Sequence, residues 1–213
     1  MNNIHSVDPR EGAFKPIFIV GVGRSGTSLL QSMLNSHSSI AFPPETHFFR
    51  YYIVPKVPWT KAADLIPKDR YLLNMELDLP KLISESSGLI DFYVRCMREY
   101  GKARNKLYIG DKDPKNIENI RTIYRYFPGA LIVHMYRDPR GVIASRLRAE
   151  WSKDSPLWQH ILAYKGQYNY MAKNSRLFPE GYVPVKYEDL LTHPRQVLQT
   201  VLSPLHLDFE PEM

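Results

Sequence analysis

Cysteine and long apolar runs are nearly absent from this sequence. Cys96 is the single cysteine, which excludes an internal disulfide framework and a zinc site built on cysteines alone. No stretch approaches the roughly 18 apolar residues of a membrane span, and no charged-then-apolar leader opens the chain. No Asn-X-Ser/Thr glycosylation site occurs either. We therefore expect a cytoplasmic protein, although a lumenal enzyme without its anchor would share these features.

A moderate excess of positive charge is present. The 213 residues suit one domain, and Lys+Arg 28 against Asp+Glu 22 gives a net charge of +6. Such a balance fits an anionic partner, whether nucleic acid, acidic membrane or a phosphorylated small molecule, and it serves solubility equally well. The sequence has no Lys/Arg run and no aromatic RNA-binding signature, so we expect no nucleic-acid partner.

Alternating apolar strands and amphipathic helices indicate the fold. Residues 1–15 have no period and are expected to form a loose arm, whereas 17–22 (IFIVGV) is typical of a strand buried on both faces. Further strands are predicted at 107–111, 130–138 and 182–187. Helices are predicted after residue 26 and at 116–127, 139–150 and 156–177, with one or two last helices at 188–202. This β–α alternation predicts an α/β, P-loop-like three-layer fold with a parallel sheet flanked by helices.

Prolines and aromatic residues are concentrated between the first two main strands. Because proline interrupts regular elements, residues 46–106 are expected to form short helices joined by stiff turns, with a longer amphipathic helix at 89–104. We interpret this segment as a helical, proline-rich insertion over the sheet edge and not as a second domain.

The glycine-rich turn after the first strand resembles a P-loop with one difference. Glycines stand at 21 and 26 and Ser28 holds the final hydroxyl position, but Thr27 replaces the lysine that reaches the outer phosphates of a triphosphate. Backbone N–H groups and a helix N-terminus should still bind an anion. A P-loop-type kinase or an ATP-binding module remains the alternative, with Asp111 or Asp113 as the magnesium-holding acid, although Thr27 argues against it.

Three blocks resemble the sulfotransferases that use 3′-phosphoadenosine 5′-phosphosulfate (PAPS). FIVGVGRSGTSLLQSMLNSH resembles their 5′-phosphosulfate loop, and HMYRDPRGVIASRL resembles their 3′-phosphate segment, with Arg137 and Ser145 in the binding positions. VPVKYEDLLTHP is similar to a late strand-to-helix signature. The RSGT loop, a glutamate soon after it (Glu45) and a KDP element (Lys112) are closest to the tyrosylprotein and bacterial branch.

This resemblance implies sulfuryl transfer from PAPS to an acceptor hydroxyl, giving a sulfate ester and 3′,5′-ADP, with no metal. The acceptor would be a small molecule, a glycan or a peptide. Arg137 and Ser145 would bind the 3′-phosphate, and Tyr187 would line the adenosine side. The 5′-phosphosulfate would be held by the loop residues Gly23, Arg24, Ser25, Gly26, Thr27 and Ser28.

The same resemblance assigns catalytic roles. Arg24 and Lys112 would stabilise the bridging oxygen and the sulfuryl group, and Glu45 would be the general base, with His47 as its rival. The insertion is expected to act as an acceptor cap, and Phe48, Phe49, Tyr51, Tyr52 and Trp59 are its predicted lining residues.

The resemblance also bears on the extent of the domain. Residues 1–213 are interpreted as a single sulfotransferase domain that ends at LDFEPEM, where relatives continue for one or more helices. Part of the C-terminal end of the domain, including a loop that closes on the donor, is therefore expected to be missing.

Overall fold

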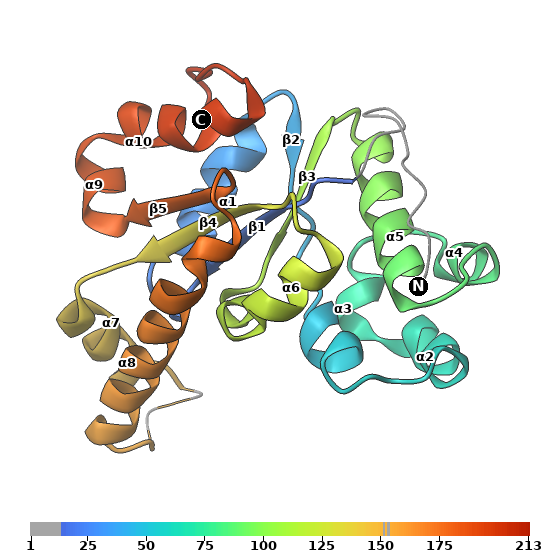
Figure 1. The fold of residues 1–213 in the computed structure, drawn as a ribbon, viewed down its shortest axis with the longest axis horizontal. Coiled ribbons are helices and arrows are strands. Elements are labelled where there is room, and N and C mark those ends of the chain that lie inside the picture. The colour runs from blue at the N-terminus through green and yellow to red at the C-terminus, as the bar shows by residue number, and fades with distance from the viewer. Residues whose placement is uncertain (1–13, 151, 153) are drawn as a thin grey trace.

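The computed structural model describes residues 14–150, 152 and 154–213, and the predicted loose arm falls almost entirely outside them. Within the described residues a parallel sheet forms the centre of the molecule (Figure 1), with its strands in the order β2-β3-β1-β4-β5. Its strands are β1 (Ile17–Gly21), β2 (Ile40–Ala41), β3 (Tyr108–Lys112), β4 (Leu131–Tyr136) and β5 (Tyr182–Lys186).

Strand β1 lies at the middle of the sheet because both of its faces can be buried. Every residue of β1 is buried, and Ile17 aligns with Gly110 of β3 on one side and with Leu131 of β4 on the other. Alternate side chains point to opposite faces, so Phe18 joins one core and Ile19 joins the other. The unbroken apolar run in the sequence follows from this two-sided burial.

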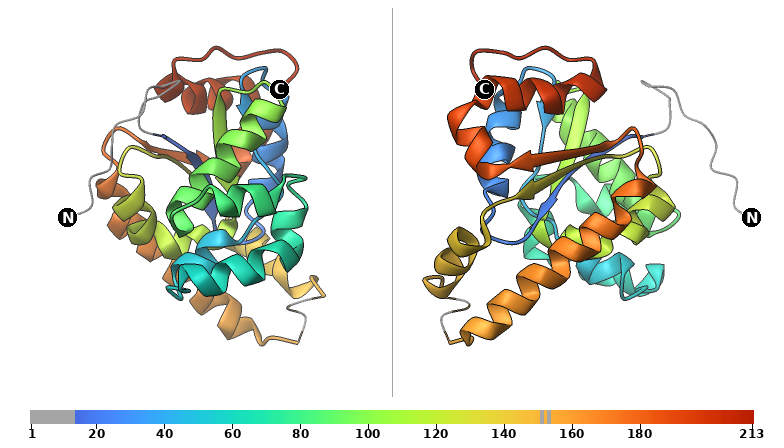
Figure 2. Two further views of the ribbon diagram at one scale, coloured as in Figure 1. Left: turned by 90° about the vertical axis from the view of Figure 1, so that its right-hand side faces the viewer. Right: turned by 60° about the vertical axis from the view of Figure 1, so that its left-hand side comes forward.

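Helices cover both faces of the sheet, which confirms the predicted three-layer architecture (Figure 2). One face packs against α1 (Thr27–Ser36), α9 (Tyr187–Thr192) and α10 (Pro194–Leu202). The other packs against α5 (Leu89–Ala103), α6 (Ile120–Tyr126) and α8 (Leu157–Asn174). Helix α7 (Pro139–Leu147) follows β4 directly and projects with the start of α8 from the end of that strand.

The structure refines two of the predicted helical segments. The segment predicted at 116–127 begins as the 3-10 turn η3 (Pro114–Asn119) before α6, because Asp113 accepts a hydrogen bond from the Lys115 N–H and fixes a tight first turn. The segment at 188–202, for which one or two helices were expected, forms two, because Pro194 cannot continue α9 and begins α10. The two-residue strand β2 is too short to produce a periodic pattern and was not predicted.

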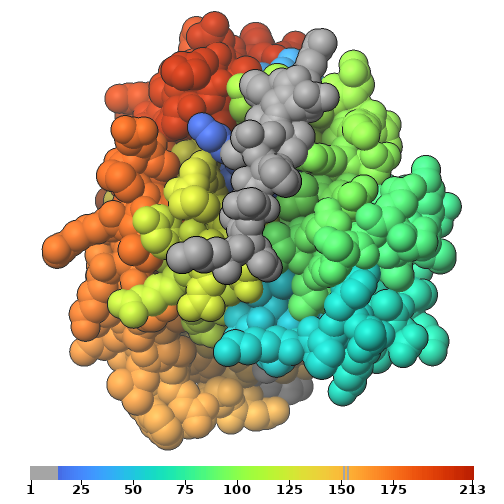
Figure 3. All heavy atoms as spheres, turned by 45° about the vertical axis from the view of Figure 1, so that its right-hand side comes forward, coloured from blue at the N-terminus to red at the C-terminus, as the bar shows by residue number. Residues whose placement is uncertain are grey.

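The insertion is helical, as expected, and forms one side of the molecule (Figure 3). It consists of η1 (Phe49–Ile53), α2 (Trp59–Leu65), η2 (Ile66–Lys68), α3 (Arg70–Leu73), α4 (Leu79–Ser84) and α5. Phe48, Phe49 and Tyr52 are buried among Phe18, Tyr93 and the other rings of the core. Their prediction as pocket-lining residues is therefore wrong. These rings pack the insertion against the sheet.

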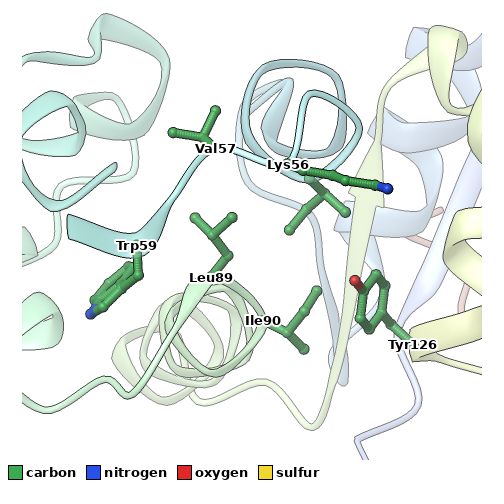
Figure 4. A pocket seen from close by; sticks show the side chains of 7 residues that line it. Lys56, Val57, Trp59, Leu89, Ile90 and Tyr126 are labelled. Carbon is green, nitrogen blue, oxygen red and sulfur yellow. The ribbon is translucent and has the colours of Figure 1, made fainter. Parts of the chain in front are cut away.

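A hollow of about 330 Å³ lies between the insertion and the end of α6 (Figure 4). It is lined by Ile53, Lys56, Val57, Trp59, Leu89, Ile90 and Tyr126. Tyr126 ends α6, which returns the chain from the carboxyl end of β3 to the start of β4. The hollow therefore lies away from the carboxyl ends of the strands. No helix among the described residues is both long and apolar enough to cross a bilayer.

Candidate active site

The predicted site residues gather at one edge of the sheet. The glycine loop follows β1, Asp113 follows β3, Arg137 follows β4 and Tyr187 follows β5. Because all these strands are parallel, their carboxyl ends lie at the same edge, which is where open α/β sheets bind ligands.

The glycine loop has the conformation of an anion-binding turn. Arg24 and Gly26 have φ angles of 80° and 94°, in the left-handed region, and Thr27 then begins α1 without a side-chain cap on its first N–H groups. The Ser25 hydroxyl is buried and has no hydrogen-bond partner among the described residues. Free N–H groups, the helix dipole and an unpartnered buried hydroxyl together fit a phosphate or phosphosulfate group.

Tyr187 is the residue against which the loop packs. A Cβ atom added to Gly26 would lie 2.3 Å from Cδ2 of Tyr187, so only glycine allows this approach. The guanidinium of Arg137 lies over the same ring, 4.4 Å from its centroid. Tyr187 therefore contacts both the glycine loop and Arg137. These contacts are additional to the role predicted for it, which is to line the adenosine side.

The two predicted phosphate-binding segments are also hydrogen-bonded to each other. Arg24 Nε donates to Ser145 Oγ at 3.0 Å, and Arg137 Nη1 lies 3.4 Å from the Arg24 carbonyl oxygen. The Tyr164 hydroxyl donates to the Arg137 carbonyl at 2.8 Å. The fold thus brings together residues separated by more than 100 positions. Arg24 points toward α7 in this arrangement and not toward Lys112.

Glu45 and Lys112 form an ion pair at the same edge of the sheet, beside the glycine loop. Lys112 is buried, and its ammonium group contacts Glu45 Oε1 and lies 3.3 Å from Ser28 Oγ, on the first turn of α1. The side chain of Glu45 is about one-third exposed. This pair places a carboxylate and a cation beside the anion-binding turn, where the sequence predicted both.

His47 is held by a contact that the sequence analysis missed. Its Nδ1 donates to Asp113 Oδ2 at 2.8 Å, and its Nε2 lies 3.7 Å from Glu45 Oε2. The hydrogen bond to Asp113 raises the pKa of His47, against the opposing effect of burial. The sequence shows an acidic residue directly after β3, but no local pattern pairs it with His47, which lies 66 residues away.

Glu45, His47 and Asp113 form a cluster that sequence spacing did not indicate. One candidate ligand atom from each lies within 4.8 Å of the others. However, Lys112 already contacts Glu45, and the Nδ1 of His47 faces Asp113. The geometry is therefore that of alternating ion pairs, and we do not assign it as a metal site.

Asp111 is a second buried carboxyl group below this cluster. It accepts a hydrogen bond from the Tyr93 hydroxyl at 2.9 Å. Burial, with the nearby charge of Asp113, raises the pKa of Asp111 to about 7. Asp111 lacks the access to solvent that a magnesium-holding acid needs, which weakens its earlier assignment in the kinase alternative.

Comparison with known proteins gives consistent results. Residues 16–211 match the Sulfotransferase family. The chain is 26% identical to protein-tyrosine sulfotransferase 1 of Danio rerio, over 90% of this chain and 53% of that protein. It is 24% identical to protein-tyrosine sulfotransferase 2 of Gallus gallus, over 88% of this chain and 50% of that protein. The chain thus spans about half the length of these relatives.

Solved structures share the fold. The sulfotransferase domain of the Synechococcus PCC 7002 olefin synthase superimposes with a TM-score of 0.75 at 23% identity, covering 100% of this chain and 78% of that one. The sulfotransferase domain from the curacin biosynthetic pathway gives a TM-score of 0.72 at 22% identity, covering 93% and 76%. Since the family match takes in almost the whole chain, the protein belongs to the Sulfotransferase family.

Proposed function

We propose that this protein transfers a sulfuryl group from PAPS to the hydroxyl group of an acceptor and releases 3′,5′-ADP. The observation that carries the proposal is the pairing of two anion-binding segments at one sheet edge: the glycine loop with its unpartnered Ser25 hydroxyl, and Arg137 with Ser145. A donor with one phosphate at each end of its ribose needs two such segments.

Each segment has donors suited to one end of the donor molecule. The 5′-phosphosulfate would accept hydrogen bonds from the N–H groups of the loop and from the hydroxyls of Ser25, Thr27 and Ser28. The 3′-phosphate would accept a bidentate pair from Arg137 and a further bond from Ser145. Thr27, where a nucleoside-triphosphate enzyme has lysine, leaves no cation at the position that serves outer phosphates.

The chemical step needs a proton acceptor and a cation at the leaving group. The acceptor oxygen forms a bond to sulfur while the bond from sulfur to the bridging oxygen breaks, and that electron pair stays on the 5′-phosphate of 3′,5′-ADP. By analogy with loose phosphoryl transfer, Lys112 stabilises this charge, and Arg24 joins it when its guanidinium turns from Ser145 to the bridging oxygen. Glu45 accepts the acceptor's proton, for which its partial exposure gives access.

The acceptor reaches Glu45 from the side of the insertion. Tyr71 of α3 lies with its ring centroid 4.5 Å from that of His47, and Tyr51 lies 5.7 Å from it. These contacts support the acceptor-cap role of residues 46–106. The names of the matched relatives make a peptide tyrosine one candidate acceptor and the hydroxyl of a small biosynthetic intermediate another.

Ligand binding tests the donor assignment without knowledge of the acceptor. We expect 3′,5′-ADP to bind in calorimetry and to raise the melting temperature, because a ligand that binds only the folded state stabilises it by mass action. ATP with magnesium should do neither at equal concentration. Preference for ATP with magnesium would instead support a kinase.

Turnover of a Glu45→Gln variant tests the assignment of Glu45 as the general base. A panel of phenols, sugars, lipid hydroxyls and tyrosine peptides with labelled PAPS would identify an acceptor. With that acceptor, Glu45→Gln should lower kcat by about 10²–10⁴ while 3′,5′-ADP binding is retained, since glutamine keeps the shape of the side chain and loses proton acceptance. Wild-type turnover in this variant would remove Glu45 from the mechanism.

A further inference from the structure

Asp113 is placed to hold another side chain and not to act on a substrate. Its side chain is only 2% exposed, and both of its oxygens are used: Oδ1 accepts from the Lys115 N–H at 2.9 Å and Oδ2 from His47 Nδ1 at 2.8 Å. A buried carboxylate with both oxygens engaged fixes the ring of His47 and directs its Nε2 outward.

His47 is restrained on every other side. Its backbone φ of 51° lies in the left-handed region, which is costly for a residue other than glycine and occurs where surrounding structure over-determines it. Tyr71 and Tyr51 contact the ring edge-to-face. The outcome of these restraints is that Nε2 faces Glu45 Oε2 at 3.7 Å.

Glu45 therefore has a nitrogen-bearing neighbour on each of its two oxygens. Lys112 contacts Oε1 and the imidazole of His47 faces Oε2. The same ammonium group lies 3.3 Å from Ser28 Oγ at the glycine loop, so an anionic donor bound there competes with Glu45 for Lys112. An anionic donor in that loop attracts Lys112 away from Glu45.

We propose that His47, fixed by Asp113, is a positioning residue that retains the Glu45 carboxylate when the donor draws Lys112 to itself. This inference rests on the proposed function, since it takes Glu45 as the base and the glycine loop as the donor site. When the donor binds, the Glu45 carboxylate loses its contact with Lys112 and keeps its contact with His47. Glu45 stays oriented toward the acceptor while Lys112 faces the bridging oxygen.

A titration of His47 by nuclear magnetic resonance tests this exchange, with His47→Gln identifying the resonance. The groups that face His47 are Asp113, Glu45, Arg50, Tyr51, Tyr71 and, through Glu45, Lys112. Saturating 3′,5′-ADP should raise the pKa of His47, because Glu45 loses Lys112 as a partner and interacts with the imidazolium instead. Asp113→Asn should lower the pKa of His47 with and without the ligand.

Glu45→Gln is the matched control for the ligand effect. The phosphates of 3′,5′-ADP act on His47 in this variant as in the wild type, whereas the carboxylate is gone. The ligand-induced rise in the pKa of His47 should therefore shrink strongly in Glu45→Gln. A rise of equal size in both proteins would show that the phosphates alone cause it, and it would overturn the exchange while leaving the donor site intact.

Turnover provides a second, independent readout. With the acceptor found by screening, His47→Gln should lower kcat by about 10- to 100-fold through misplacement of Glu45, a smaller loss than Glu45→Gln, with 3′,5′-ADP affinity unchanged. Unchanged kcat in both His47→Gln and Asp113→Asn, with Glu45→Gln inactive, would refute the positioning role alone. Failure of 3′,5′-ADP to bind at all would refute the donor site and this inference with it.

Discussion

Gly26 combines a left-handed backbone with a close contact to a side chain. Its φ is 94°, and any Cβ would lie 2.3 Å from Tyr187 Cδ2. An alanine at this position would meet both penalties at once, because the backbone angle is unfavourable for an L-residue and the Tyr187 ring is also in contact with Arg137.

Gly26→Ala should therefore destabilise the protein by about 1–3 kcal/mol and weaken 3′,5′-ADP binding. Gly23→Ala is the matched control, since a Cβ at Gly23 meets nothing within 4 Å and its φ is not in the left-handed region. Urea unfolding and calorimetry on both variants make the comparison. Equal stability losses would show that the contact with Tyr187 carries no energetic weight.

Arg137 is the residue whose replacement most directly tests the 3′-phosphate site. Its bidentate, charge-assisted contact should favour 3′,5′-ADP over AMP by about ten- to a hundred-fold, and Arg137→Ala should abolish most of that preference. Arg140→Ala is the control: Arg140 is exposed and paired with Asp138, so the preference should remain. Equal affinity of the wild type for AMP and 3′,5′-ADP would contradict the assignment of Arg137 and Ser145.

At the scale of elements, the β4–β5 pair contains a buried histidine that makes stability depend on pH. His134 of β4 lies 2.8 Å from the Tyr182 hydroxyl of β5 through Nδ1, and its Nε2 has no partner among the described residues. Burial lowers the pKa of His134 to about 4. The unfolded chain takes up this proton near pH 6.5 and the native state only near pH 4, so this contribution to stability is complete above pH 6.5 and is lost as the pH falls toward 4.

His134→Asn should remove that pH dependence while it keeps a polar group near Tyr182. The loss of stability between about pH 7 and about pH 4 should be smaller in the variant by about 3 kcal/mol. His206→Asn is the control, since His206 is exposed. Urea unfolding of the three proteins across this range measures the difference. A variant with the wild-type pH slope would show that His134 titrates normally.

The insertion is the other element whose role can be separated from the sheet. Tyr51 and Tyr71 contact His47, whereas Leu73, on the same short helix as Tyr71, is exposed. The double change Tyr51→Leu/Tyr71→Leu should raise the acceptor KM by about tenfold and leave 3′,5′-ADP affinity unchanged. Leu73→Ala should change neither quantity. Reduced 3′,5′-ADP affinity with an unchanged acceptor KM would make the insertion purely structural.

For the molecule as a whole, local sequence patterns predicted most of the fold. The strand at 17–22, the glycine turn and the helix after it can be predicted from neighbouring residues alone. Burial on both faces produces an unbroken apolar run, and a helix produces apolar residues at helical spacing. Strand β2 and the 3-10 turn η3 could not be predicted, because two residues carry no period and the turn depends on the cap from Asp113.

Motifs in the sequence point to the residues of the candidate site, but they do not show which of these residues contact each other. The glycine loop, Glu45, Lys112, Arg137 and Ser145 were found from motifs, and the parallel sheet explains why they share an edge. The pairing of His47 with Asp113 spans 66 residues and that of Arg24 with Ser145 spans 121. No local pattern records such pairs, so the sequence left His47 as a rival base when the structure shows it held beside Glu45.

The sequence by itself determined the alternation of strands and helices, the anion-binding turn and the resemblance to PAPS-dependent sulfotransferases, because each is written in adjacent residues. Only the tertiary structure decided that Phe48 and Phe49 belong to the core and that Tyr187 packs against the loop at Gly26. It also decided that Asp113 pairs with His47 and Lys112 with Glu45. Those outcomes depend on which side of a strand faces which helix. Asp111 and Lys112 are neighbours on β3 whose side chains point to opposite faces, so Asp111 meets Tyr93 of α5 whereas Lys112 meets Glu45.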